Sequence, residues 1–194
     1  MQVMQHRRPR ALGLAAALLF VATAAQAATL QERIALCAGC HGEDGNSKLE
    51  KIPSLAGQPA FFTMNSLFLM REGVRKVDAM ASFVKDLTDE ELDGLSKHYA
   101  ALPAKPSGEA VDQALAQKGA TVATQRGCGS CHLPTLAGSE QIPRLAKQRI
   151  DYLIPTLKSY RDAPRPGADT AMSAAIAGAS DEDIAALANF AASK

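Results

Sequence analysis

Two short segments of identical pattern, Cys37–His41 and Cys128–His132, constrain the fold of this chain more than any other feature. Each reads Cys-x-x-Cys-His, and together they use all 4 cysteines and 2 of the 4 histidines. In this pattern the two thiols can add to the two vinyl groups of one haem, and the adjacent His binds the iron as proximal ligand. The sequence therefore predicts two covalently bound haem c groups. The predicted attachment sites are Cys37, Cys40, Cys128 and Cys131, and the predicted proximal ligands are His41 and His132.

Two other uses of paired cysteines are alternatives at this stage. A zinc site built from two Cys-x-x-Cys knuckles usually separates them by about 15–20 residues, whereas Cys37 and Cys128 are 91 positions apart. A redox-active Cys-x-x-Cys disulfide does not require the His that follows each pair here. Covalent haem explains both the spacing and the histidines.

The two motifs belong to an internal repeat, which indicates two similar units along the chain. Residues 52–58 and 142–148 both read Ile-Pro-x-Leu-Ala-x-Gln, and further downstream Met80 pairs with Met172. Between the halves, residues 102–108 contain two prolines and a glycine, which favour an extended linker. We therefore expect two tandem domains, residues 28–103 and residues 104–194.

Helix signals recur in both halves, and no segment has the pattern of a strand. Capping boxes at 29–32 and 88–91, and a similar start at 180–183, predict helix N-termini. Residues 59–72 are so apolar that we expect a largely buried helix there, with Pro59 in its first turn. The chain has no Trp and only 5% aromatic residues, so a buried haem would supply much of each small core. The predicted fold class is all-α, with two cytochrome c-like domains each enclosing one haem.

The N-terminus has the organisation of a secretory signal peptide. Three arginines precede an apolar run over residues 11–25, which is too short to span a bilayer, and Ala-Gln-Ala follows at 25–27. We predict a signal peptide over residues 1–27, a mature chain from Ala28 and a periplasmic location; an uncleaved anchor is the alternative. The mature chain would hold 18 basic and 20 acidic residues with no polybasic run, which argues against nucleic acid as a partner.

A methionine thioether is the expected sixth ligand of each iron in an electron carrier, because it raises the reduction potential and closes the metal to substrate. Met172 is the only methionine of the second half, and Met80 is its counterpart in the first. Met64 and Met70 lie in the apolar 59–72 segment, where core packing is the better interpretation, but they stay alternatives to Met80.

Residues beyond the ligands also recur. Pro53 and Pro143 follow the two motifs at nearly equal distance, so their carbonyls could accept the second ring N–H of each proximal His, or the prolines could only rigidify the loops. Four repeated arginines could pair with haem propionates or could be solvated helix ends. These are Arg71, Arg75, Arg161 and Arg165.

With these residues assembled, the chain resembles the di-haem cytochrome c4 family over essentially all of its mature length. The resemblance rests on the two Cys-x-x-Cys-His segments, on His-Gly-x-Asp-Gly-Asn-Ser at 41–47, on Pro-x-Leu-Ala-Gly-Gln at 53–58 and on Met80. It implies that the two haems lie close enough to exchange electrons, and that the protein carries electrons from quinol-oxidising complexes toward terminal oxidases. One departure is residues 133–138, which lack the Gly-x-Asp-Gly pattern, so the edge of the second haem could be differently exposed.

Three functions are compatible with these features. An electron carrier, not an enzyme, is favoured because Met80 and Met172 would close both irons. The alternative is the electron-accepting cytochrome subunit of a larger periplasmic oxidoreductase, such as a flavoprotein dehydrogenase. A di-haem peroxidase would need an iron with an open or displaceable position. In each case the partners are redox proteins, and any membrane association would be peripheral and through those partners.

Overall fold

The computed structural model describes residues 2, 28–163 and 170–194. Within these ranges the chain is helical, with one isolated β-bridge between Ser139 and Ile142 and no strand, which confirms the all-α class. In the same ranges no helix combines the length and apolarity needed to cross a bilayer. The predicted signal peptide, apart from residue 2, and Arg165 lie outside the described residues.

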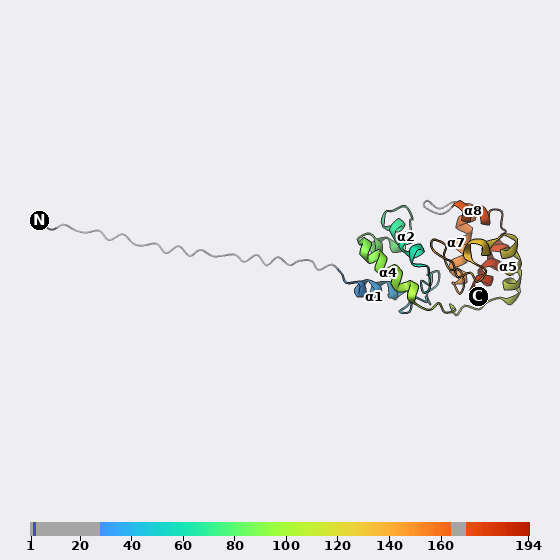
Figure 1. Cartoon of the computed structure of the whole chain (residues 1–194), viewed down its shortest axis with the longest axis horizontal. Helices are drawn as coiled ribbons and strands as arrows, with labels where there is room; N and C mark the ends of the chain where they lie inside the picture. Colours follow the sequence, from blue (N-terminus) through green and yellow to red (C-terminus); the bar gives the residue numbers. More distant parts are fainter. Residues whose placement is uncertain (1, 3–27, 164–169) are drawn as a thin grey trace.

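The helices form two groups that lie side by side (Figure 1). In the first group α4 packs against α1 and α2, and α2 packs against α3. The bounds are α1 Leu30–His41, α2 Ala60–Arg71, α3 Asp78–Val84 and α4 Asp89–Ala101. The shared core consists of Ile34, Val84, Leu87, Leu92, Leu95 and Tyr99. This small core borders Cys37, so the Cys-x-x-Cys-His segment lies directly on it.

The second group repeats this plan, with α9 packed against α5 and α7. The bounds are α5 Gln113–Gln125, α6 Cys128–His132, α7 Ile150–Asp162, α8 Thr170–Ile176 and α9 Asp181–Ala192. Helices α5 and α9 cross so closely that a Cβ on Gly119 would clash with the backbone of Ala186. Whereas α1 runs continuously through its Cys-x-x-Cys-His segment, the second domain breaks before α6 at Gly127, which has φ 67°.

The three predicted helix starts are confirmed. Thr29 and Thr88 each accept a hydrogen bond from the N3 backbone N–H, and the N3 glutamate bonds back to the cap. Ser180 and Asp183 do the same at α9. Each cap satisfies backbone N–H groups that have no partner inside the helix.

The expectation that the apolar 59–72 helix would be largely buried is wrong. The helix is present as α2, with Pro59 at its N-cap, but Thr63 is its one buried residue, and Phe61 and Phe68 are 47% and 42% exposed. Helix α2 packs against α3 and α4, but the contact leaves two of its three phenylalanines, Phe61 and Phe68, largely exposed. Apolar composition alone therefore overestimated the burial, because it does not say how many sides of a helix find a partner.

The segment between the groups, residues 103–112, has no regular structure but is fixed to both. The buried amide of Asn46 donates to Pro103 O at 3.1 Å and accepts from Lys105 N at 2.8 Å. Further along, the carboxylate of Glu109 accepts from the first two backbone N–H groups of α7, at 2.8 and 3.0 Å. The connection has no regular structure, and these hydrogen bonds hold it against both groups of helices.

Candidate haem sites

Helix α1 presents the first Cys-x-x-Cys-His segment at its C-terminal end. Cys37 is half-buried, Cys40 is exposed and His41 is buried. His41 Nδ1 lies 2.8 Å from Pro53 O. A carbonyl oxygen only accepts, so Nδ1 carries the proton, and Nε2 keeps the lone pair that can bind iron. Burial lowers the pKa of His41, which favours the neutral imidazole that binds metals.

The second segment has the same geometry. His132 is buried at the end of α6, and its Nδ1 lies 2.8 Å from Pro143 O. Cys128 is half-buried and Cys131 is exposed. Burial also lowers the pKa of His132. The hydrogen bonds expected at Pro53 and Pro143 are therefore present, and the prolines orient the imidazoles.

The methionines divide between the two cores. Met80 packs on the core that borders Cys37, and Met172 packs on the one that borders Cys128. Met64 and Met70 also border the first core, so packing alone does not select Met80. Met80 and Met172 stay predictions as iron ligands.

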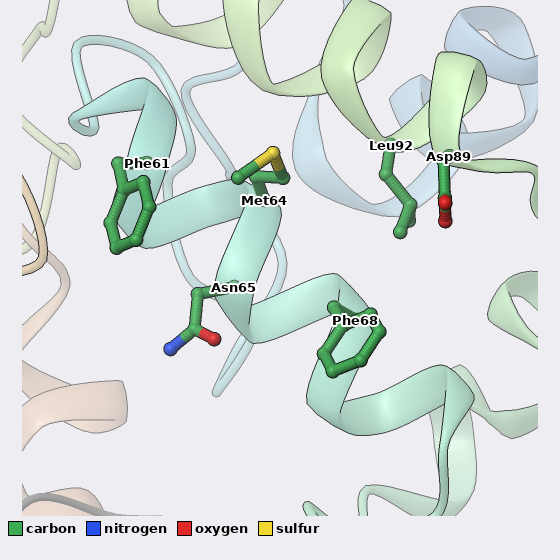
Figure 2. Close-up of a pocket in the computed structure, with 6 residues that line it drawn as sticks. All are labelled: Phe61, Met64, Asn65, Phe68, Asp89 and Leu92. Carbon is green, nitrogen blue, oxygen red and sulfur yellow. The ribbon is translucent and has the colours of Figure 1, made fainter.

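A hollow between α2 and α4 contains one of these alternatives (Figure 2). Its lining is Phe61, Met64, Asn65, Phe68, Asp89 and Leu92. Figure 2 shows Met64 on α2, across from Leu92 of α4. No cysteine or histidine is among the described residues that line this hollow, and Met64 also packs against the first core.

The interpretation of Arg71 and Arg161 needs correction. Arg71 Nη1 donates to Leu87 O at 2.9 Å and to Asp89 at 2.8 Å. Arg161 Nη1 makes the matching bonds to Ala179 O at 2.9 Å and to Asp181 at 2.7 Å. Both side chains are mostly buried and are bonded at the N-termini of α4 and α9, so neither is a solvated helix end.

The described residues fit haem c. Each motif supplies two free thiols and one oriented imidazole, and Nε of both Arg75 and Arg144 is buried with no hydrogen-bond partner in the described ranges. Haem carries two propionate carboxylates, which are suitable partners for such groups. Arg144 is 5% exposed, and burial lowers its pKa to about 10. In the same ranges no group of three or more His, Cys, Asp or Glu is arranged to hold a zinc ion.

Two glutamines join the domains, and sequence reasoning did not assign them a role. Gln148 accepts from Ser54 N at 2.8 Å and donates to Ser54 O at 2.9 Å. Gln58 accepts from Arg144 N at 3.0 Å and donates to Arg144 O at 2.9 Å. The signal was available, because each glutamine ends a copy of the repeated Ile-Pro-x-Leu-Ala-x-Gln, but the partner lay in the other domain.

The departure after His132 leaves the backbone conformation largely unchanged. Leu133 has φ 66° and ψ 157°, close to the φ 85° and ψ 146° of Gly42 at the matching position. Leu136 likewise has φ 58° where Gly45 has φ 72°. Two leucines thus adopt conformations that glycine adopts at no steric cost.

Two helical domains that each contain a Cys-x-x-Cys-His segment, with its buried His bonded to a proline carbonyl, define a di-haem c-type cytochrome. Family models described as "Cytochrome c" and "Cytochrome C oxidase, cbb3-type, subunit III" match residues 116–193 and 22–98. Cytochrome c4 of Pseudomonas aeruginosa is 30% identical over 176 residues, which cover 86% of this chain and 88% of the relative. The chain belongs to the cytochrome c4 family.

Two further matches agree with this assignment. The crystal structure of reduced recombinant cytochrome c4 from Pseudomonas stutzeri matches with a TM-score of 0.76 and 28% identity, over 84% of this chain and 95% of that one. The thiosulfate dehydrogenase electron acceptor of Stutzerimonas stutzeri is 31% identical, over 79% of this chain and 76% of its own. The protein therefore carries two covalent haem c groups and is an electron carrier, not an enzyme.

Proposed function

We propose that this protein is a periplasmic di-haem cytochrome that transfers electrons between respiratory redox partners. The iron ligands are His41 and Met80 in one domain, residues 28–103, and His132 and Met172 in the other, residues 104–194. The observation that carries the proposal is the pair of buried histidines, each bonded through Nδ1 to a proline carbonyl at 2.8 Å.

The chain's own residues hold each iron site rigid and closed. When bound, the haem iron supplies a one-electron couple. The proline carbonyls fix the tautomer and ring orientation of both histidines, and so limit reorganisation when the charge of the iron changes. With haem bound, the thioethers of Met80 and Met172 would serve as ligands to the irons and would exclude substrate, which favours carriage over catalysis.

The donor is a quinol-oxidising complex or a dehydrogenase, and the acceptor is a terminal oxidase or another redox protein. The role of a dehydrogenase as the electron donor has specific support, because one relative is named as the electron acceptor of thiosulfate dehydrogenase. Export through residues 1–27 brings the chain to these partners. N-terminal sequencing of the mature protein should begin at Ala28; an intact Met1 on purified protein would contradict export by cleavage.

The ligand assignment is tested by a pyridine haemochrome count and spectroelectrochemical titration of the whole protein. We expect two low-spin haems, and we expect Met80→Ala and Met172→Ala each to lower the potential of one of them. Met64→Leu and Met70→Leu are matched controls and should leave both potentials unchanged. A shift with Met64→Leu but none with Met80→Ala would move the ligand to Met64. A high-spin haem that reacts with peroxide in the unmodified protein would refute the proposal that the protein is an electron carrier with two closed irons.

Purification from the native host distinguishes a free electron carrier from a cytochrome subunit of a larger oxidoreductase. Recovery as a free monomer supports the soluble carrier. Stable stoichiometric recovery with a flavoprotein or other dehydrogenase supports the subunit.

A further inference from the structure

The two interdomain glutamines bond to the same peptide groups that orient the proximal histidines. The peptide between Pro53 and Ser54 accepts from His41 through its carbonyl, at 2.8 Å, and donates through its N–H to Gln148, also at 2.8 Å. The haem ligand of the first domain is thus one peptide group away from a side chain of the second.

The second domain repeats this chain of bonds in the opposite direction. The peptide between Pro143 and Arg144 accepts from His132 at 2.8 Å and donates to Gln58 at 3.0 Å. The two glutamines occupy equivalent positions in the repeat, and so do Ser54 and Arg144. The arrangement therefore has approximate two-fold symmetry in its bonding.

The side chains in these hydrogen-bond chains are buried, apart from the two prolines, which are partly buried. Gln58 and Gln148 are 5% and 2% exposed, and Ser54 is fully buried. The orientation of each amide is fixed, since a backbone N–H must meet its oxygen and a backbone carbonyl must meet its nitrogen. One difference separates the halves: Gln148 Oε1 also accepts from Arg149 N at 3.0 Å, so its acceptor is shared.

Hydrogen bonds in series strengthen one another, because a peptide that donates through its N–H becomes a better acceptor at its carbonyl. A better acceptor draws the Nδ1 proton further from the imidazole and makes Nε2 a stronger electron donor. A more strongly donating ligand stabilises ferric over ferrous iron and lowers the reduction potential.

We propose that Gln58 and Gln148 are positioning residues that tune the two haem sites crosswise, each acting on the proximal histidine of the other domain. The proposal rests on His41 and His132 being the proximal ligands, as proposed above. It makes the potential of each haem depend on the docking of the opposite domain.

The test uses Gln148→Met and Gln58→Met in the full holoprotein. Methionine keeps the length and most of the volume of glutamine but removes both hydrogen bonds. Each variant is titrated electrochemically with NMR detection, and each haem is assigned through its contacts to Cys37 or Cys128. The two variants are controls for each other because they change equivalent positions.

We expect Gln148→Met to raise the potential of the haem on Cys37 and to move the His41 Nδ1 proton upfield in the reduced protein, with the other haem unchanged. Gln58→Met should do the same to the haem on Cys128 and to His132. The backbone bond from Phe62 N to Glu140 O, 3.0 Å long, also crosses between the domains, so an unchanged Phe62 amide resonance reports an intact interface.

Three results would overturn the crosswise role: no shift in either variant, a shift of the haem in the glutamine's own domain, or equal shifts of both haems with a displaced Phe62 resonance. The last would mean that the glutamines only hold the interface together. A protein with other than two histidine-ligated haems would instead refute the proposed function, so the two failures are distinguishable.

Discussion

Leu133 lets backbone strain be measured directly, because glycine and alanine should exchange their usual order of stability there. Its φ of 66° and ψ of 157° lie in a region that is almost restricted to glycine. Any side chain there costs about 1–3 kcal/mol. Glycine in place of alanine normally costs about 0.4–1 kcal/mol through the unfolded chain.

Leu133→Gly and Leu133→Ala both remove the leucine side chain, which is 39% exposed, so the loss of its burial largely cancels between them. Two effects then separate the free energies of unfolding of the variants. Glycine relieves the backbone strain in the folded state, but it also gives the unfolded chain more conformational entropy. The net effect favours Leu133→Gly by about 1 kcal/mol. In a domain of this size that difference separates the two midpoints by about 4–8 °C.

The assay is guanidinium and thermal unfolding of the two holoprotein variants, followed by far-UV circular dichroism. The free energies of unfolding of the two variants can be compared if the slope of free energy against denaturant concentration is the same in both. Ala35→Gly, at an exposed position inside α1, is the control and should destabilise by about 1 kcal/mol. If Leu133→Gly proved no more stable than Leu133→Ala, the argument from backbone strain would be refuted.

Three more substitutions probe the packing and the linker. Gly119→Ala should destabilise the second domain by about 1–3 kcal/mol in chemical unfolding, because its Cβ meets the backbone of Ala186; an unchanged midpoint would contradict the close crossing. Asn46→Ala should cost about 1–3 kcal/mol by leaving linker groups unpaired, with a stability equal to wild type as the contrary result. Lys105 lowers the pKa of Asp44 to about 2, so their ion pair is complete above pH 4 and is lost as the pH falls through 2. NMR titration of Asp44 should show this lowered pKa in wild type and a rise toward the ordinary value in Lys105→Met; equal values in both proteins would exclude the pairing.

Many structural features of this protein, among them the haem attachment segments and the helix starts, follow from local sequence. The spacing of Cys37, Cys40 and His41 suits haem attachment wherever the segment lies, because covalent attachment and ligation occur within five residues. The capping boxes at Thr29 and Thr88 are local for the same reason, since their partners lie three residues away. The helix periods, the repeat and the relation to the cytochrome c4 family therefore follow from the amino-acid sequence alone.

Tertiary structure decided the features whose partners are distant in sequence. The composition of α2 predicts its helix but not its exposed phenylalanines, because burial depends on which neighbours arrive. Arg71 binds residues 16 and 18 positions away, and Gln148 binds Ser54 across 94 positions, so no local pattern specifies either contact. By itself the sequence determined that two haems are attached, and it predicted His41 and His132 as the histidines that bind them. Only the folded chain brought the peptides that follow Pro53 and Pro143 against the other domain's glutamines, because that contact requires both domains to be packed together.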